Sequence, residues 1–263
     1  MISWIVQSNL IKESSQDDIR IACERLGYNY IPLKIIPFSE GTEWSADIGF
    51  KPPEGKLAFY GSTSMIKMVA RSKWNKDGFF FNQSNLKTSL WIQKLGNRVL
   101  NYDSKFMTLA EAMENIGEGM FFMKPDNDLK DFTGSDVDAQ GIKKFYDSVS
   151  AGGFLFGTDI EVVISPIKNL GWEYRCFMVG DKVVSASSYK LKSMLRDDKR
   201  VSQDIIDFAE ETAKIWKPDN AYVMDICETD NGLKVVEFNC VNASGFYSCD
   251  AEKIVRSISE FIS

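Results

Sequence analysis

The chain has 263 residues, 44% hydrophobic and 26% charged, which is typical of globular proteins and long enough for one large or two modest domains. A formal net charge of −6 and an isoelectric point near 5.0 argue against electrostatic binding of a nucleic-acid backbone. The sequence contains no histidine, which excludes Ser-His-Asp and Cys-His nucleophile pairs and most zinc sites, so any chemistry must use carboxylates, lysines, arginines and a metal held by oxygen.

The cysteines and the apolar runs indicate where the protein resides. Five cysteines, an odd number, lack any C-x-x-C spacing and lie mostly in apolar stretches. This pattern predicts reduced thiols in a cytoplasmic protein. No apolar run approaches roughly 18 residues, and the N-terminal segment lacks a basic region, so we expect neither a membrane span nor a signal peptide.

The first hundred residues alternate short apolar runs with amphipathic stretches, a rhythm typical of a small parallel α/β sheet. The expected strands are Ser3–Gln7, Tyr30–Pro37 and Lys56–Gly61, and the expected helices run from about Gln16 to a stop at Gly27 and from Ser64 to Arg71.

The middle of the chain mixes both element types, and we place a domain boundary within it, near Asn101. A buried strand is predicted at Gly78–Phe81, a helix at Leu86–Leu95 with Gly96 ending it, a helix from the capping box Thr108–Glu111 to Gly117, a strand at Met120–Lys124, and a helix from Ser135 or Asp138 to Val149.

The last hundred residues show antiparallel hairpin signals, with turns at Gly180-Asp181 and at Asp230-Asn231-Gly232. The predicted strands are Ile160–Ser165, Tyr174–Val179, Lys182–Tyr189, Ala221–Cys227 and Leu233–Asn239, and the predicted helices are Ser202–Trp216 and Asp250–Ile262. The fold class is therefore α+β, with an N-terminal α/β domain over residues 1–100 and a second domain over residues 101–263.

Two carboxylates and an amide are expected to converge in the last hairpin. If the chain turns near Asn231, Asp225 and Glu237 pair across the strands, and alternation places Asn239 on the same face as Glu237. Oxygen ligands without histidine or cysteine suit Mg²⁺ and leave positions open for phosphate. The alternative is an ordinary polar strand edge, although the flanking residues are apolar.

Two basic residues lie in apolar strands. Lys124 ends one strand directly before Pro125, and is either aimed at a nucleotide phosphate or a lysine whose ammonium reaches solvent. Arg175 shares a strand face with Glu173 and either forms a structural ion pair or meets an anion. From Arg175 alone, the structural pair is the better interpretation.

Together these residues resemble the ATP-grasp superfamily over about residues 80–250. The resemblance rests on Lys124-Pro125, on the Glu173-Tyr174-Arg175 strand with its hairpin to Lys190, and on Asp225 followed by Glu237-Phe238-Asn239. It implies an ATP-grasp fold, in which two α+β lobes clamp ATP behind a small α/β pre-ATP-grasp domain. Within the superfamily the chain is most similar to a small phage and bacterial clade regarded as peptide or amino-acid ligases.

The resemblance also implies roles for individual residues. The nucleotide would be bound by a phosphate lysine, an earlier and more loosely aligned lysine, a hinge strand that reads adenine, and an acid near the ribose; these are Lys124, Lys87, Val163 with Ile164, and Glu173. The other implied residues are the magnesium ligands Asp225, Glu237 and Asn239, the catalytic pair Arg175 and Lys190, and the substrate loop with Ser244 and Gly245. That loop lacks the proline found in relatives.

The implied activity is an ATP-dependent carboxylate–amine ligase that uses ATP and two Mg²⁺ ions and passes through an acylphosphate. Its partners would be ATP, an amino-acid, peptide or protein carboxylate, and an amine acceptor. Two alternatives stay open: a small-molecule kinase on the same fold, and a non-catalytic nucleotide-binding scaffold.

Overall fold

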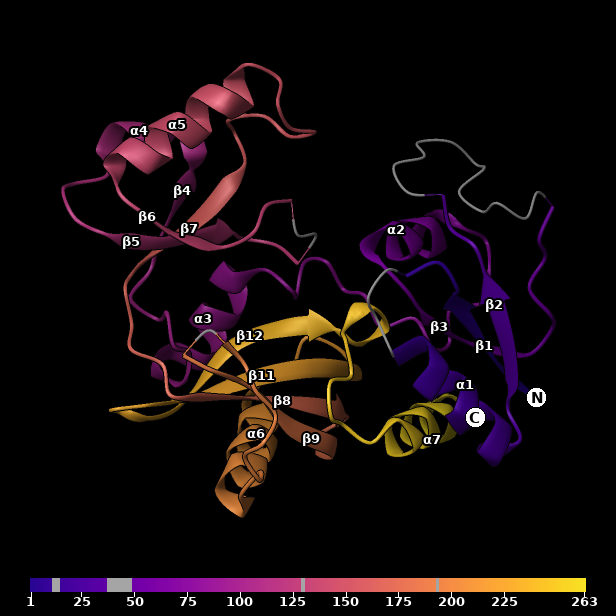
Figure 1. The fold of residues 1–263 in the computed structure, drawn as a ribbon. Coiled ribbons are helices and arrows are strands. Elements are labelled where there is room, and N and C mark those ends of the chain that lie inside the picture. The colour runs from indigo at the N-terminus through magenta and orange to yellow at the C-terminus, as the bar shows by residue number, and fades with distance from the viewer. Residues whose placement is uncertain (11–14, 37–48, 129–130, 193) are drawn as a thin grey trace.

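The computed structural model describes residues 1–10, 15–36, 49–128, 131–192 and 194–263, and within them the chain forms three sheets flanked by helices (Figure 1). The end of the strand predicted at Tyr30–Pro37 therefore lies outside the described residues. Fold class α+β is confirmed.

The first sheet is parallel, in the order β2-β1-β3, which confirms the predicted βαβ rhythm. The helix α1 ends before Gly27, whose φ of +74° is the left-handed conformation that glycine adopts without steric cost. The N-terminal elements are β1 (Ile2–Gln7), α1 (Ser15–Leu26), β2 (Asn29–Leu33), β3 (Lys56–Tyr60) and α2 (Thr63–Arg71).

The second sheet is antiparallel, in the order β4-β7-β5-β6, and α4 and α5 pack on one of its faces. The capping box at Thr108 and Glu111 is formed as predicted, and α5 begins after Asp138 rather than at Ser135. The elements are β4 (Lys105–Thr108), α4 (Leu109–Asn115), β5 (Phe121–Pro125), β6 (Ser135–Val137), α5 (Ala139–Ser150) and β7 (Glu161–Pro166).

The third sheet is antiparallel, in the order β10-β9-β8-β11-β12, and its hairpins form where the turn signals predicted them. The helices α3 and α6 pack on one face of this sheet, whereas α7 packs at the other. The elements are α3 (Thr88–Leu95), β8 (Trp172–Val179), β9 (Lys182–Leu191), β10 (Met194–Leu195), α6 (Gln203–Ile215), β11 (Ala221–Thr229), β12 (Gly232–Cys240) and α7 (Ala251–Ile262).

Three short strands were not predicted: β4, β6 and β10. They have 4, 3 and 2 residues, which is too short for an alternating hydrophobic pattern to be recognised.

The strand predicted at Gly78–Phe81 is wrong. Only Gly78 forms an isolated bridge, to Ala58 in β3, and the residues after it leave the sheet. The side chain of Asn242 takes over the backbone hydrogen bonds: its Nδ2 donates to the carbonyls of Phe59 (2.7 Å) and Gly78 (2.9 Å), and its Oδ1 accepts from the N–H of Phe80 (2.8 Å). A buried amide thus replaces a neighbouring strand.

We expect Asn242→Ala to lower the free energy of unfolding by at least about 3 kcal/mol, because three buried backbone groups lose their partner at roughly 1–3 kcal/mol each. Chemical denaturation followed by circular dichroism measures this loss. Asn115→Ala is the control, because Asn115 is exposed at the end of α4 and should change stability by only about 0.5 kcal/mol. Equal stability of the two variants would contradict the role given to Asn242.

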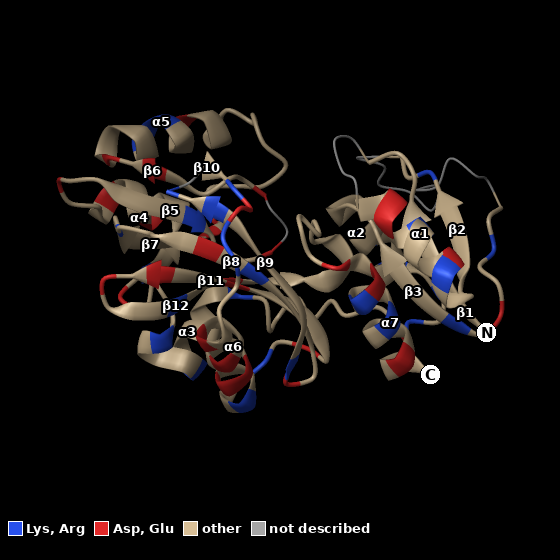
Figure 2. Ribbon diagram, turned by 60° about the horizontal axis from the view of Figure 1, so that its bottom comes forward, with Lys and Arg blue, Asp and Glu red and all other residues tan. Residues whose placement is uncertain are grey.

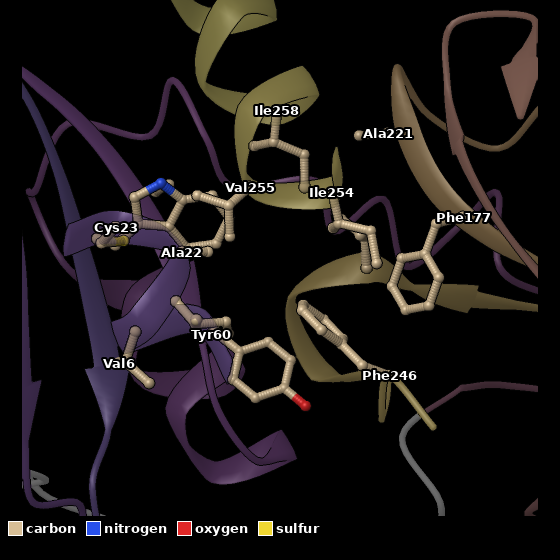
Figure 3. Packing of buried hydrophobic residues seen from close by; sticks show 14 of the residues in the cluster. Val6, Ala22, Cys23, Tyr60, Phe177, Ala221, Phe246, Ile254, Val255 and Ile258 are labelled. Atoms are coloured by element: carbon tan, nitrogen blue, oxygen red, sulfur yellow. The ribbon is translucent and has the colours of Figure 1, made fainter. Parts of the chain in front are cut away.

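The main core joins the first sheet to the end of the chain (Figure 3). Helix α7 packs against α1, and the indole N–H of Trp4 in β1 donates to Ser259 Oγ at 3.0 Å. The cluster shown includes Val6, Ala22, Cys23, Tyr60, Phe177, Ala221, Phe246, Ile254, Val255 and Ile258. Because packing crosses residue 100 in this way, the predicted domain boundary stays a prediction.

Acidic and basic residues are interspersed along the ribbon (Figure 2). None of the helices within the described ranges has the length and apolar character that crossing a bilayer requires. All five cysteines are buried free thiols.

Candidate functional site

A cavity of about 550 Å³ lies between the second and third sheets, within the size range of small-molecule sites. It is lined from one side by β5, β6 and the end of β7, and from the other by β8, β9 and β12. The lining residues that the sequence had singled out are Lys124, Glu173, Lys190, Glu237 and Asn239.

The pairing of Asp225 with Glu237 is confirmed, but a bulge produces it. The turn is a two-residue loop, since Thr229 pairs with Gly232, and an uninterrupted ladder would therefore place Asp225 opposite Val236. The register shifts between Asp225 and Ile226, so that one extra residue on β12 brings Glu237 opposite Asp225. Val236 and Glu237 both line the cavity as a result.

Opposite charges face each other across this cavity. Lys124 projects from β5, with Nζ 5.0 Å from the ring centroid of Trp91, and its charge acts on Glu237 in β12. Burial alone would raise the pKa of Glu237, but the charges of Lys124 and Arg175 outweigh burial and bring this pKa below its ordinary value. Burial lowers the pKa of Lys124, although the charges of Glu237, Asp128 and Asp126 oppose it.

Arg175 forms a buried, bidentate ion pair with Asp225. Its Nε donates to Oδ1 at 2.9 Å and its Nη2 to Oδ2 at 2.7 Å, and its Nη1 reaches the carbonyl of Gly245 at 3.1 Å. Burial raises the pKa of Asp225 to about 6, against the lowering effect of the Arg175 charge. The structure thus contains the structural pair favoured for Arg175, and neither residue of the pair lines the cavity.

A second bulge shapes the other end of the cavity. Glu173 pairs with Lys190 and Tyr174 with Ser188, which leaves Tyr189 without a residue opposite. Tyr189 and Lys190 therefore both line the cavity, although strand alternation would separate them. The Tyr189 hydroxyl donates to Glu173 Oε2 at 2.9 Å, and Lys190 Nζ lies 3.9 Å from the same oxygen.

The structure places Val163 and Ile164 outside the cavity. They lie in β7, which pairs with β4 on one side and β5 on the other, so their backbone groups belong to ladders. Both side chains are buried. The segment that follows, Pro166–Lys168, lines the cavity instead. The expected adenine-reading hinge therefore moves to these residues, because the ladder leaves no free backbone groups further back.

Lys87 also lies outside the residues that line the cavity; it caps α3 and its ammonium is paired with the Glu161 carboxylate. Ser244 is buried, and its hydroxyl donates to the carbonyl of Cys240 at 2.8 Å. Ser244 lines a small neighbouring hollow together with Asn239, whereas Gly245 holds Arg175 through its carbonyl. Their assignments as nucleotide and substrate residues stay predictions.

Sequence reasoning missed several lining residues: Phe122, Asp128, Phe132, Asp136, Lys168 and Tyr189. Lys168 forms an ion pair with Asp103 at 2.5 Å, and Asp128 accepts a hydrogen bond from the N–H of Cys240 at 2.9 Å. These contacts join segments far apart in the chain, so spacing could not reveal them. Phe122 was detectable, because alternation along β5 puts it on the face of Lys124.

The donor set at the cavity suits a hard divalent cation in part. Glu237 and Asn239 line the cavity, and Asn239 Nδ2 donates to Glu237 Oε1 at 3.1 Å and to Asp225 Oδ2 at 3.3 Å, which leaves the amide oxygen to face a cation. One carboxylate and an amide fit Mg²⁺ that retains waters and phosphate ligands. Among the described residues, no group of three or more carboxylate or thiol side chains is gathered around a metal position. Asp225 as a third ligand stays a prediction.

A family model described as an ATP-grasp domain, the third family of one clade of that superfamily, matches residues 81–258. No curated protein is similar enough in sequence to match the chain.

Solved structures of several ligases are similar over the full length of the chain. D-cycloserine synthetase DcsG matches with a TM-score of 0.60 at 11% identity, covering 100% of both chains. D-alanine–D-alanine ligase from Bacillus anthracis matches with a TM-score of 0.61 at 13% identity, covering 100% of this chain and 97% of that one. The ATP-grasp ligase PsnB, complexed with precursor peptide PsnA2 and AMPPNP, matches with a TM-score of 0.53 at 11% identity, covering 100% and 97%. At these identities the similarity shows a shared fold.

Proposed function

This chain belongs to the ATP-grasp superfamily, in the clade family whose model it matches, and from that membership we propose that it is an ATP-dependent ligase that joins a carboxylate to the amine of an amino acid or peptide. The observation that carries the proposal is the cavity itself, where Lys124 from one sheet faces Glu237 and Asn239 from the other. Such a site presents a cation to phosphate oxygens on one side and hard oxygen donors to a metal on the other.

Each wall of the cavity has a role in binding ATP. Lys124 would contact phosphate oxygens, Glu173 would accept hydrogen bonds from the ribose hydroxyls, and Pro166–Lys168 would lie along the adenine. Mg²⁺, held by Glu237 and Asn239, would supply positive charge that neutralises the triphosphate. We retain Asp225 as a candidate further ligand and two ions as the candidate number.

The proposed reaction needs no protein nucleophile, which suits a chain without histidine. A substrate carboxylate oxygen attacks the γ-phosphorus of ATP, the bond to the β,γ-bridging oxygen breaks, and ADP leaves. The amine of the second substrate then attacks the acylphosphate carbonyl, inorganic phosphate leaves, and the amine loses a proton. Lys190 is positioned to orient the substrate carboxylate, because its ammonium lines the cavity beside Glu173.

The structural relatives support an amino-acid or peptide substrate. One is a D-alanine–D-alanine ligase, and another was solved with a precursor peptide. Both are similar to this chain in fold only, so they support the class of substrate rather than its identity.

The test is ADP release from Mg-ATP in the presence of a panel of amino acids and dipeptides, with mass spectrometry of the products. We expect ADP release that depends on a carboxylate together with an amine, and a product equal in mass to both substrates less one water. A product heavier by one phosphoryl group would identify a kinase instead. If Mg-ATP neither binds nor yields ADP, the ligase proposal is wrong and the scaffold alternative replaces it.

A further inference from the structure

Tyr247 has an unusual backbone conformation for a bulky residue. It lies in the loop after β12, with a φ of +49°, and 45% of it is exposed. A bulky side chain in the left-handed region persists only when the surrounding structure determines it, and such residues concentrate at functional sites.

The residues on both sides of Tyr247 are anchored. Phe246 is buried between the rings of Tyr60 and Phe177, at centroid distances of 5.3 Å and 5.1 Å. On the other side, Ser248 Oγ donates a hydrogen bond to a carboxylate oxygen of Asp197, in the segment that follows β10. The loop therefore holds the Tyr247 ring in one position while leaving part of it open to solvent.

The ring of Tyr247 extends the wall of the cavity. It stacks on Tyr189, with centroids 5.0 Å apart and an interplanar angle of 28°, and the Arg175 guanidinium lies 4.9 Å from its centroid. Tyr189 lines the cavity and lies 5.0 Å from the ammonium of Lys190. Lys190 is 3.9 Å from Glu173, beyond hydrogen-bond distance, so its charge can be shared with a ligand.

We propose that Tyr247 determines specificity for the carboxylate substrate: the carboxylate pairs with Lys190, and an aromatic or large apolar side chain beside it packs on the exposed part of the Tyr247 ring. This inference rests on the proposed ligase function and adds the class of side chain that the site prefers. An uncharged ring beside an ammonium is a surface for an acid with an apolar side chain, because Asp225 already neutralises Arg175.

The test uses two matched carboxylates, N-acetyl-L-phenylalanine and N-acetyl-L-alanine, titrated into the full chain with Mg²⁺ and a non-hydrolysable ATP analogue. We expect wild type to bind the phenylalanine probe about two- to tenfold more tightly, the range that one aromatic contact provides. Tyr247→Phe should keep this preference, whereas Tyr247→Ala and Tyr247→Gly should both lose it.

The alanine and glycine variants separate contact from strain. Both remove the ring, but glycine adopts a positive φ without steric cost, so Tyr247→Gly should unfold at a higher temperature than Tyr247→Ala. Equal loss of preference in two variants of unequal stability supports contact with the substrate. No preference in wild type, or a preference lost in Tyr247→Ala but kept in Tyr247→Gly, overturns the proposal.

The same proteins show whether the proposed function itself has failed. A rise in the unfolding midpoint with the Mg²⁺-bound analogue and no preference between probes would refute only the role of Tyr247. No rise in wild type would refute the nucleotide site.

Discussion

Glu237→Gln is expected to abolish both ADP formation and the magnesium-dependent stabilisation by ATP. For wild type, ligand at about a hundred times its dissociation constant adds roughly 2.7 kcal/mol. In a protein of this size that raises the unfolding midpoint by about 5–10 °C. The substitution keeps the volume of the side chain but removes the only charge that β12 presents to the cavity among the described residues, so metal and triphosphate lose their anchor. Thermal unfolding with and without Mg-ATP measures the effect.

Glu228→Gln is the matched control on the same hairpin. Glu228 lies outside the residues that line the cavity and pairs with Lys199 at 2.5 Å and with the hydroxyl of Tyr174 at 2.7 Å. This variant should retain the full rise with Mg-ATP, although its own midpoint falls somewhat. A normal rise in Glu237→Gln would remove the metal assignment, and a rise lost in both variants would point to general damage to the hairpin.

Arg175→Met is expected to destabilise the fold by about 3–5 kcal/mol, because it leaves the fully buried Asp225 carboxylate without its partner. The unfolding midpoint should fall by about 10–15 °C. The guanidinium also holds the Gly245 carbonyl and lies against the rings of Tyr189 and Tyr247, so its loss removes contacts on three sides. Denaturant unfolding of the protein without ligands measures the stability.

The double variant Arg175→Met with Asp225→Leu separates the pair from the loop. Replacing both members of a buried ion pair by apolar residues of similar size is often neutral for stability, so the double variant should recover most of the loss. If Arg175→Met alone is as stable as wild type, the ion pair does not stabilise the fold. If the double variant is no better than the single one, the contacts to Gly245 and the tyrosines dominate instead.

Local patterns in the sequence were sufficient to predict most elements and the core of the site. Turn residues at Asp230-Asn231 and Gly180-Asp181 predict the two hairpins, and Thr108 with Glu111 predicts the start of a helix. These signals work because turn formation, capping and strand alternation depend on residues close together in the chain. The lysine before Pro125 and the Glu237-Phe238-Asn239 strand end were identified for the same reason.

Tertiary structure alone decided how these residues face one another. Bulges opposite Asp225 and Glu173 bring Glu237, Tyr189 and Lys190 to the cavity, and strand alternation by itself does not reveal a bulge.

The partner of Arg175 is 50 residues away, and the amide of Asn242 replaces a strand neighbour for Gly78 across 164 residues. Val163 and Ile164 were assigned to the nucleotide because their segment is apolar, yet pairing on both sides of β7 buries them. By itself the sequence determined which residues are available for chemistry, since that follows from residue type and local spacing. Which of them meet is set by long-range packing, because contacts between distant segments depend on the whole fold.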